Sequence, residues 1–299
     1  MQVFQADVEK SRDFLYELFK RNTSDEATDW LNDKLEKVKG ANSARELYWA
    51  FSAAPRFVGK TVLQLQESEL SKADVLRPGF NPSKWTTDQT ARTLLLLSIP
   101  HQDQNEFLHK LNQLFSTAEM GELVALYASL PLLPYPGDFK LRAAEGIRTN
   151  MGTVFEAIAL DNPYPADYLD EGAWNQLVLK TVFVGKPLYR IYGLEIRSNP
   201  TLARILSDYA HERWAAGRTV TPELWRPVGP FLNAFLMEDI KRVFAHPEQI
   251  QQEAAALACS QSNFIPAKEL LEAHPVLKNK IETGELNWNY IGRKSLPAN

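Results

Sequence analysis

The chain has a single cysteine, Cys259, among its 299 residues. One thiol cannot form an internal disulfide, and it excludes a zinc site built from several thiolates. Such a chain suits a reducing compartment, so the cytoplasm is the expected location.

Long apolar runs are also missing, because charged or polar residues interrupt every hydrophobic stretch well before the roughly twenty residues that a membrane-spanning helix needs. The sequence therefore predicts no transmembrane segment. The formal net charge of -4 gives no electrostatic reason for binding nucleic acid, which is excluded as a partner.

Strand-like alternation between turn residues is almost absent, whereas apolar residues recur at helical spacing along the whole chain. The predicted fold is all-α, an irregular stack of antiparallel helical hairpins, with a HEAT-like stack as one arrangement of this kind. Helices are predicted at 6–21, 86–98, 103–116, 118–129, 140–148, 151–160, 171–184, 199–216, 231–245, 248–260 and 266–282. A further helix that contains Trp49 and Phe51 should end at Pro55.

Two segments have the composition of connections. Residues 73–84 contain two prolines and a glycine without helical periodicity, which predicts a loop. Residues 130–139, LPLLPYPGDF, contain three prolines and a glycine and predict a joint between an N-terminal region, 1–130, and a central and C-terminal region, 131–299. Together these regions are expected to form one continuous helical domain.

Arginine replaces lysine as the main basic residue between residues 139 and 230, where eight arginines accompany three lysines. The rigid guanidinium fork suits paired carboxylates or an anionic ligand, and both interpretations stay open. Arg142, Glu145 and Arg148 are spaced three apart and should form a ladder on one helix side.

The predicted helix 199–216 places Arg213 in the same sector as its apolar residues. A buried guanidinium needs a counter-charge, so Arg213 should meet a carboxylate from another helix or an anionic ligand. Asp208, His211 and Glu212 are neighbours on another side, at spacings that would allow shared contacts. They supply only one carboxylate-x-x-His unit, so no metal is predicted, and a solvated or salt-bridged face is the simpler interpretation.

Three more residues belong to the predicted ligand site. Asn175 falls inside an apolar arc of the predicted helix 171–184, so its amide needs a specific partner, either a neighbouring turn or a ligand. Gly185 and Pro187 should end that helix and begin another, which leaves Lys180 and Arg190 near a common turn. We find no nucleophile elbow and no glycine-rich phosphate loop, and no cofactor is predicted.

Several long runs resemble the EboA family of metabolite-traffic proteins. They are ANSARELYWAFSAAPRFVGK, ELVALYASLPLLPYP, RAAEGIRTNMGTVFEAIALDNPYPADYL, WNQLVLKTVFVGKPLYRI, LSDYAHERWAAGRTVTPELWRPVGPF and AAALACSQS. The resemblance implies a bacterial protein encoded in the ebo gene cluster, which is associated with moving secondary-metabolite precursors. It supplies no catalytic residues to transfer to this chain.

The expected function is therefore that of an accessory protein that binds a small anionic metabolite or another ebo-cluster protein. Arg142, Arg148, Lys180, Arg190 and Arg213 are the expected anion contacts. An isomerase or transferase that uses His211 or Glu145 as acid or base is one alternative, and a pure interaction scaffold is the other.

Overall fold

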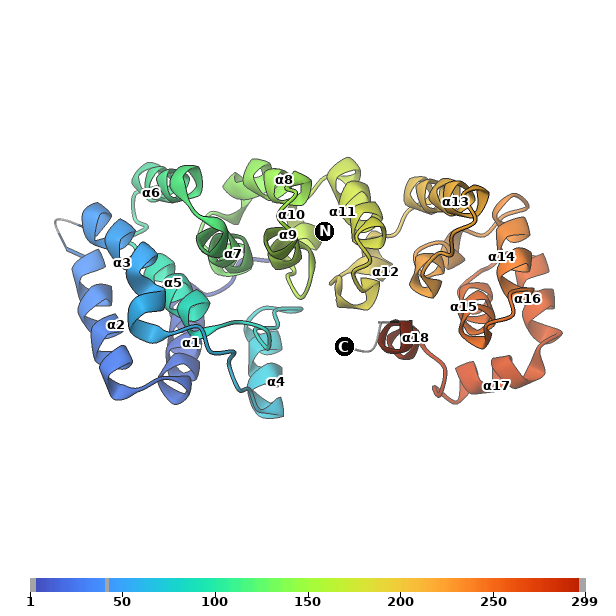
Figure 1. Cartoon of the computed structure of the whole chain (residues 1–299), viewed down its shortest axis with the longest axis horizontal. Coiled ribbons are helices and arrows are strands. Elements are labelled where there is room, and N and C mark those ends of the chain that lie inside the picture. Colours follow the sequence, from blue (N-terminus) through green and yellow to red (C-terminus); the bar gives the residue numbers. More distant parts are fainter. Residues whose placement is uncertain (1–3, 41–42, 296–299) are drawn as a thin grey trace. The chain divides into compact units, whose positions relative to one another are not determined.

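A computed structural model describes residues 4–40 and 43–295 of the chain, which forms two compact units, 1–170 and 171–299. The described residues form helices and one isolated β-bridge, between Val62 and Thr86, without a sheet (Figure 1). The all-α prediction is confirmed, while the stacked-hairpin, HEAT-like arrangement stays a prediction. No helix in the described part of the chain is both long enough and apolar enough to cross a membrane.

The first unit contains ten α-helices and two 3₁₀ helices among its described residues. They are α1 (Val8–Asn22), α2 (Asp25–Val38), α3 (Ser43–Val58), α4 (Glu67–Leu76), α5 (Thr87–Leu97), α6 (Gln104–Thr117), α7 (Met120–Ser129), η1 (Leu130–Leu132), η2 (Pro136–Phe139), α8 (Lys140–Arg148), α9 (Gly152–Ala159) and α10 (Tyr164–Tyr168).

Helix α5 is the centre of this unit, and every one of its residues is buried. It packs against α1, α2, α3 and α7, which surround it in Figure 1. Because no side of α5 faces water, its charged residues must find partners inside the protein. Arg92 Nη1 lies 2.7 Å from the carboxylate of Asp88 one turn away. Burial lowers the pKa of Arg92, and the charge of Asp88 opposes that shift.

Pro55 does not end α3, which continues to Val58, so the predicted end at this proline is wrong. A proline inside a helix has no N–H for the carbonyl four residues earlier, here that of Phe51. The Nε of Arg92 donates a 2.8 Å hydrogen bond to that carbonyl. The helix therefore tolerates Pro55 because a neighbouring helix supplies the missing donor.

The two predicted connections are also more ordered than their composition suggested. The segment 130–139 forms η1 and η2, and Leu130, Leu132 and Phe139 are buried in the core. It lies within the first unit, so the joint predicted there does not coincide with the division at 170. The segment 73–84 begins inside α4, and the buried side chain of Arg77 forms an ion pair with Asp167.

The second unit contains the remaining described helices. They are α11 (Glu171–Phe183), η3 (Leu188–Arg190), α12 (Leu194–Arg197), α13 (Pro200–Ala215), η4 (Pro222–Trp225), η5 (Gly229–Phe231), α14 (Leu236–Phe244), α15 (Gln249–Ser260), α16 (Ile265–Glu272), α17 (Pro275–Glu282) and α18 (Trp288–Ser295).

Helix α15 is the centre of the second unit. It packs against η4, η5, α14, α16, α17 and α18, and Figure 1 shows α14 and α16 beside it. Residues 254–259, AAALAC, are all buried. Small side chains let neighbouring backbones approach closely, so this alanine-rich run explains how one short helix contacts six others.

The C-terminal part of the second unit differs from its prediction. The predicted helix 266–282 is two helices, because Pro275 begins α17 and disfavours helical backbone at His274, which has a φ of -121° and a ψ of 64°. Helix α18 was not predicted, since its short length gives little periodicity to read.

A substitution at Gly146 of α8 can test the packing of the first unit, because an added methyl group would lie 2.6 Å from the ring of Tyr127. Tyr127 is buried, so its ring cannot move freely. Gly146→Ala should lower the free energy of unfolding by about 1–3 kcal/mol. Gly152→Ala, at the first residue of α9 with no atom within 4 Å of the new methyl group, should be neutral or slightly stabilising. Urea unfolding followed by circular dichroism compares the two, and equal stability of both variants would contradict the tight contact.

Candidate functional site

Two neighbouring cavities lie at the start of α15 in the second unit. The larger cavity has a volume of about 470 Å³. Its walls come from the end of α11, the end of α13, the segment that follows α13, the start of α15 and the end of α18. Its lining residues are Val182, Phe183, Gly185, Tyr209, Arg213, Thr219, Val220, Thr221, Pro222, Glu248, Ile250, Gln251, Lys294 and Ser295.

The chain reverses after α13 at Gly217, and this turn builds the wall between the cavities. Gly217 has a φ of 67°, in the left-handed region that favours glycine. The N–H of Arg218 donates a 2.9 Å bond to the carbonyl of Arg213, which closes the helix end. Residues 218–221 then run back along the cavities towards η4, and we call residues 217–221 the partition.

Arg213 holds the partition on the side of the larger cavity. Its Nε and Nη2 donate bonds of 3.3 and 3.2 Å to the carbonyl of Thr219. The sequence predicted a carboxylate from another helix or an anionic ligand as the partner of Arg213, and the acceptor in these two bonds is a neutral carbonyl. The side chain is half-buried at the helix end, and the guanidinium has five N–H donors, so its outer edge can still meet an acceptor in the cavity.

The larger cavity combines charge with apolar surface. Lys294, at the end of α18, is the second cation of the lining, and its Nζ lies 4.8 Å from the centre of the Tyr290 ring. Glu248 contributes one acidic side chain. Phe183 is 72% exposed although it is a large hydrophobic residue, and it offers an apolar surface at the cavity. The site can accept a molecule that has both an anionic and an apolar part.

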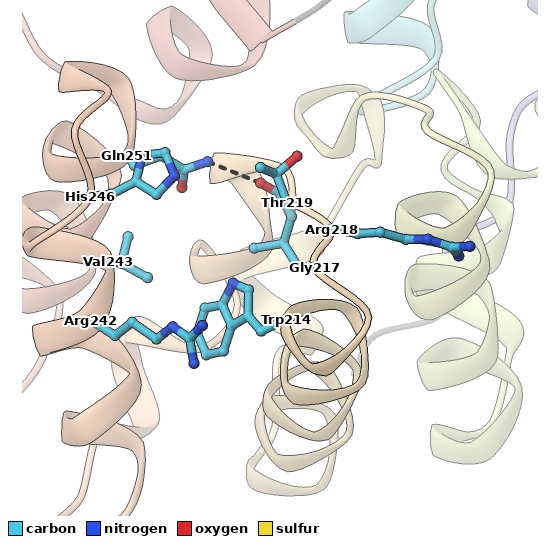
Figure 2. Close-up of a pocket in the computed structure, with 9 residues that line it drawn as sticks. Trp214, Gly217, Arg218, Thr219, Arg242, Val243, His246 and Gln251 are labelled. Carbon is cyan, nitrogen blue, oxygen red and sulfur yellow. Dashed lines mark hydrogen bonds between the residues drawn. The ribbon is translucent and has the colours of Figure 1, made fainter.

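The smaller cavity, which we call the Trp214 cavity, lies on the other side of the partition and has a volume of about 270 Å³ (Figure 2). It shares Thr219, Val220 and Gln251 with the larger cavity. The amide of Gln251 donates a 3.0 Å bond to the carbonyl of Val220, drawn as the dashed line in Figure 2. Two side chains, Arg213 and Gln251, therefore hold the partition through its backbone carbonyls.

A buried carboxyl group, Glu223, lies next to Pro222 in the wall of the larger cavity. It accepts hydrogen bonds of 3.0 and 2.7 Å from the N–H groups of Leu188 and Tyr189. Burial raises the pKa of Glu223 to about 7, and these two N–H donors and Arg226 oppose the shift. Glu223 thus ties η4 to the start of η3 and positions the wall.

The predicted ladder of Arg142, Glu145 and Arg148 lies in the first unit, on α8. Arg142 Nη1 is 3.0 Å from Glu145, and its guanidinium also lies 5.4 Å from the ring centre of Phe115. Arg148 is exposed. The other seven predicted site residues are in the second unit, so the predicted set is divided between two units.

Asn175 has the specific partner that the sequence required. Its side chain and that of Asn199 exchange two amide hydrogen bonds, of 2.9 and 3.4 Å. Asn199 in turn accepts a 2.8 Å bond from the N–H of Leu202 at the start of α13. The amide of Asn175 therefore supports a helix cap, which is the structural alternative stated from the sequence.

The predicted turn after α11 is present. Lys186 N–H donates to the carbonyl of Thr181 and Gly185 N–H to that of Val182, a pattern that ends a helix at glycine. Lys180 is half-buried, and burial lowers the pKa of its ammonium group. Arg190 is half-buried in η3.

Asp208 and His211 have different partners. Asp208 pairs with Arg204 at 3.1 Å on the exposed side of α13. His211 Nε2 lies 2.5 Å from the buried carboxylate of Asp239, which also accepts a 2.6 Å bond from Ser207. Glu212 is exposed. The His211 and Glu145 side chains are 44% and 50% exposed, so neither acid–base candidate is enclosed.

Sequence reasoning missed most of the cavity lining. Glu248 and Gln251 were placed on a predicted helix without a functional role, and Lys294 follows the part of the chain where helices were predicted. Glu223 lies in a turn between two prolines, where nothing in the sequence pattern indicated burial. These residues come from separate elements, and no local spacing connects them.

Comparison with known proteins identifies a family. The family model described as metabolite traffic protein EboA matches residues 11–229. That range includes Arg213 and the partition, whereas the run AAALACSQS, α15 and Lys294 lie beyond it. Neither a curated protein nor a solved structure matches the chain.

Glu223 should make stability depend on pH. The folded protein keeps a proton on this group up to a pKa of about 7, whereas an unfolded carboxyl loses it near 4.5. Between these values the folded state binds more protons, so the free energy of unfolding should fall as pH rises, by at most about 1.4 kcal/mol per pH unit. Urea unfolding at pH 5 and pH 8 measures this fall, which Glu223→Gln should reduce. The same pH dependence in wild type and variant would exclude Glu223 as its source.

The His211–Asp239 contact should contribute to stability. His211→Ala removes the contact of His211 with the buried Asp239 carboxylate and leaves the hydrogen bond from Ser207. The free energy of unfolding should therefore fall by about 1–3 kcal/mol. Glu212→Ala, next to it on the exposed face, should change the free energy of unfolding by less than about 0.5 kcal/mol. Chemical unfolding of both variants tests the difference, and an unchanged stability of His211→Ala would show that the contact is dispensable.

Proposed function

Because the chain belongs to the EboA family, a family described as metabolite traffic proteins, we propose that it binds a small anionic metabolite in the larger cavity. The observation that supports this most directly is the position of Arg213, which lines the cavity together with Lys294. Two cations from different helices at one opening favour an anionic group between them.

The size and composition of the larger cavity agree with this proposal. Its volume of about 470 Å³ falls in the range of about 300–1,000 Å³ that is typical of small-molecule sites. Arg213 would contact a carboxylate or phosphate with the edge of its guanidinium that faces away from Thr219. Phe183 and Val182 would cover an apolar part of the same molecule.

The remaining predicted anion contacts, Arg142, Arg148, Lys180 and Arg190, are not among the residues that line this cavity. Arg142 already has a carboxylate partner in Glu145. We therefore assign the anion contact to Arg213 and add Lys294 as a second contact. The description of the family as metabolite traffic proteins favours binding and release of a molecule over a chemical reaction.

A binding experiment tests the proposal. The purified protein is incubated with a polar metabolite extract of cells that express the ebo gene cluster, and retained molecules are measured by mass spectrometry after ultrafiltration. At least one anion should be retained by the wild type, and Arg213→Ala and Lys294→Ala should each reduce its retention about tenfold, the loss of one charge-assisted contact.

Arg204→Ala is the matched control, because Arg204 is an exposed arginine of the same helix, pairs with Asp208 and does not line the cavity. It should retain as much anion as the wild type. Lys294→Ala leaves the Arg213–Thr219 contact in place, so its effect cannot come from a disturbed partition. An anion that both cavity variants retain fully, or the absence of any retained anion, would contradict the proposal and favour the interaction scaffold.

A further inference from the structure

The Trp214 cavity contains an arginine that lies over an aromatic ring. The guanidinium of Arg242 lies over the ring of Trp214, 4.2 Å from its centre. On α13, Trp214 also stacks on Trp225, with 5.8 Å between the ring centres and 24° between the planes, and Trp225 is completely buried. A cation–π contact does not consume the N–H donors of the guanidinium, so N–H groups of Arg242 remain for an acceptor.

Two further side chains of the cavity can donate hydrogen bonds. His246 Nδ1 accepts a 3.1 Å bond from the backbone N–H of Glu248. An accepting Nδ1 cannot bear a proton, so the proton of the neutral ring is on Nε2, which becomes a donor. The indole N–H of Trp214 is the third donor, and Figure 2 shows the ring nitrogen on the side of Trp214 that faces Gly217 and Thr219.

The charge of this lining has one sign. The described residues that line the Trp214 cavity include no aspartate or glutamate, and no salt bridge to Arg242 occurs among the described residues. Arg218 also belongs to the lining, but its side chain points away from the other lining residues in Figure 2, so we assign it no role. The larger cavity differs in this respect because Glu248 lines it.

We propose that the Trp214 cavity is a second binding site, which takes a single oxyanion group, a phosphate or a carboxylate. Arg242 supplies the charge, and His246 Nε2–H and the indole N–H of Trp214 supply neutral donors. The volume of about 270 Å³ accommodates such a group with a few water molecules, since each water occupies about 30 Å³ in the liquid. This inference does not depend on a ligand in the larger cavity.

Nuclear magnetic resonance of the indole N–H groups of the full chain tests the site. The Trp214 resonance is assigned by its loss in Trp214→Phe. Sodium phosphate and sodium acetate are titrated separately at constant ionic strength, with sodium chloride as the reference. Phosphate or acetate should shift the Trp214 resonance and saturate, whereas chloride should not. A response to phosphate alone identifies a phosphate group as the ligand, and a response to acetate identifies a carboxylate.

Variants locate the bound anion. Arg242→Gln should weaken the saturating response about tenfold. Arg204→Gln should leave it unchanged, because Arg204 also lies over an aromatic ring, 4.7 Å from the centre of Phe235, but does not line the cavity. Lys294→Ala should leave it unchanged as well, because Lys294 lines the larger cavity, does not line the Trp214 cavity and makes no contact that holds the partition.

Two results would overturn this proposal. One is the absence of a saturating response to either anion, or the same response in Arg242→Gln as in the wild type. The other is a response that Lys294→Ala removes and Arg242→Gln does not, which would place the anion in the larger cavity and would support the proposed function instead.

Discussion

The packing of α15 is the constraint on which both cavities depend. Residues 254–259 of this helix are buried and mostly alanine, so η4, η5, α14 and α18 can all approach it. Its first turn is thereby fixed between the partition and α18, with Gln251 bonded to the carbonyl of Val220. The cavities occur where these elements meet and cannot fill the space around the turn at Gly217.

A single buried arginine has a comparable role in the first unit. Arg92 pairs with Asp88 and also supplies the donor that Pro55 takes away from the carbonyl of Phe51. A buried guanidinium is costly without such partners, and a helix with an interior proline is costly without a replacement donor. The hydrogen bond from Arg92 to the Phe51 carbonyl lowers both costs, and it joins α3 to α5.

Several arginines between residues 139 and 230 have carboxylate partners within their own unit. Arg142 pairs with Glu145, Arg204 with Asp208 and Arg226 with Glu195, so internal ion pairs account for several of them. Arg213 is different because its partner in the protein is a neutral carbonyl, which leaves its charge without a counter-charge in that contact. This difference separates a candidate anion contact from arginines of similar sequence context.

The sequence by itself determined the all-α class, most helices beyond residue 86 to within a few residues, the need for a partner at Asn175 and the helix end at Gly185. These features depend on local periodicity and turn chemistry, which neighbouring residues specify. The sequence pattern wrongly predicted a helix end at Pro55, because Arg92 supplies the hydrogen-bond donor that the proline lacks. Only the tertiary structure decided that Arg213, Gln251 and Lys294 meet around one partition, and that Arg242 lies on Trp214. These residues are distant in the chain, and the packing of α13, α14 and α18 around α15, not any local pattern, brings them together.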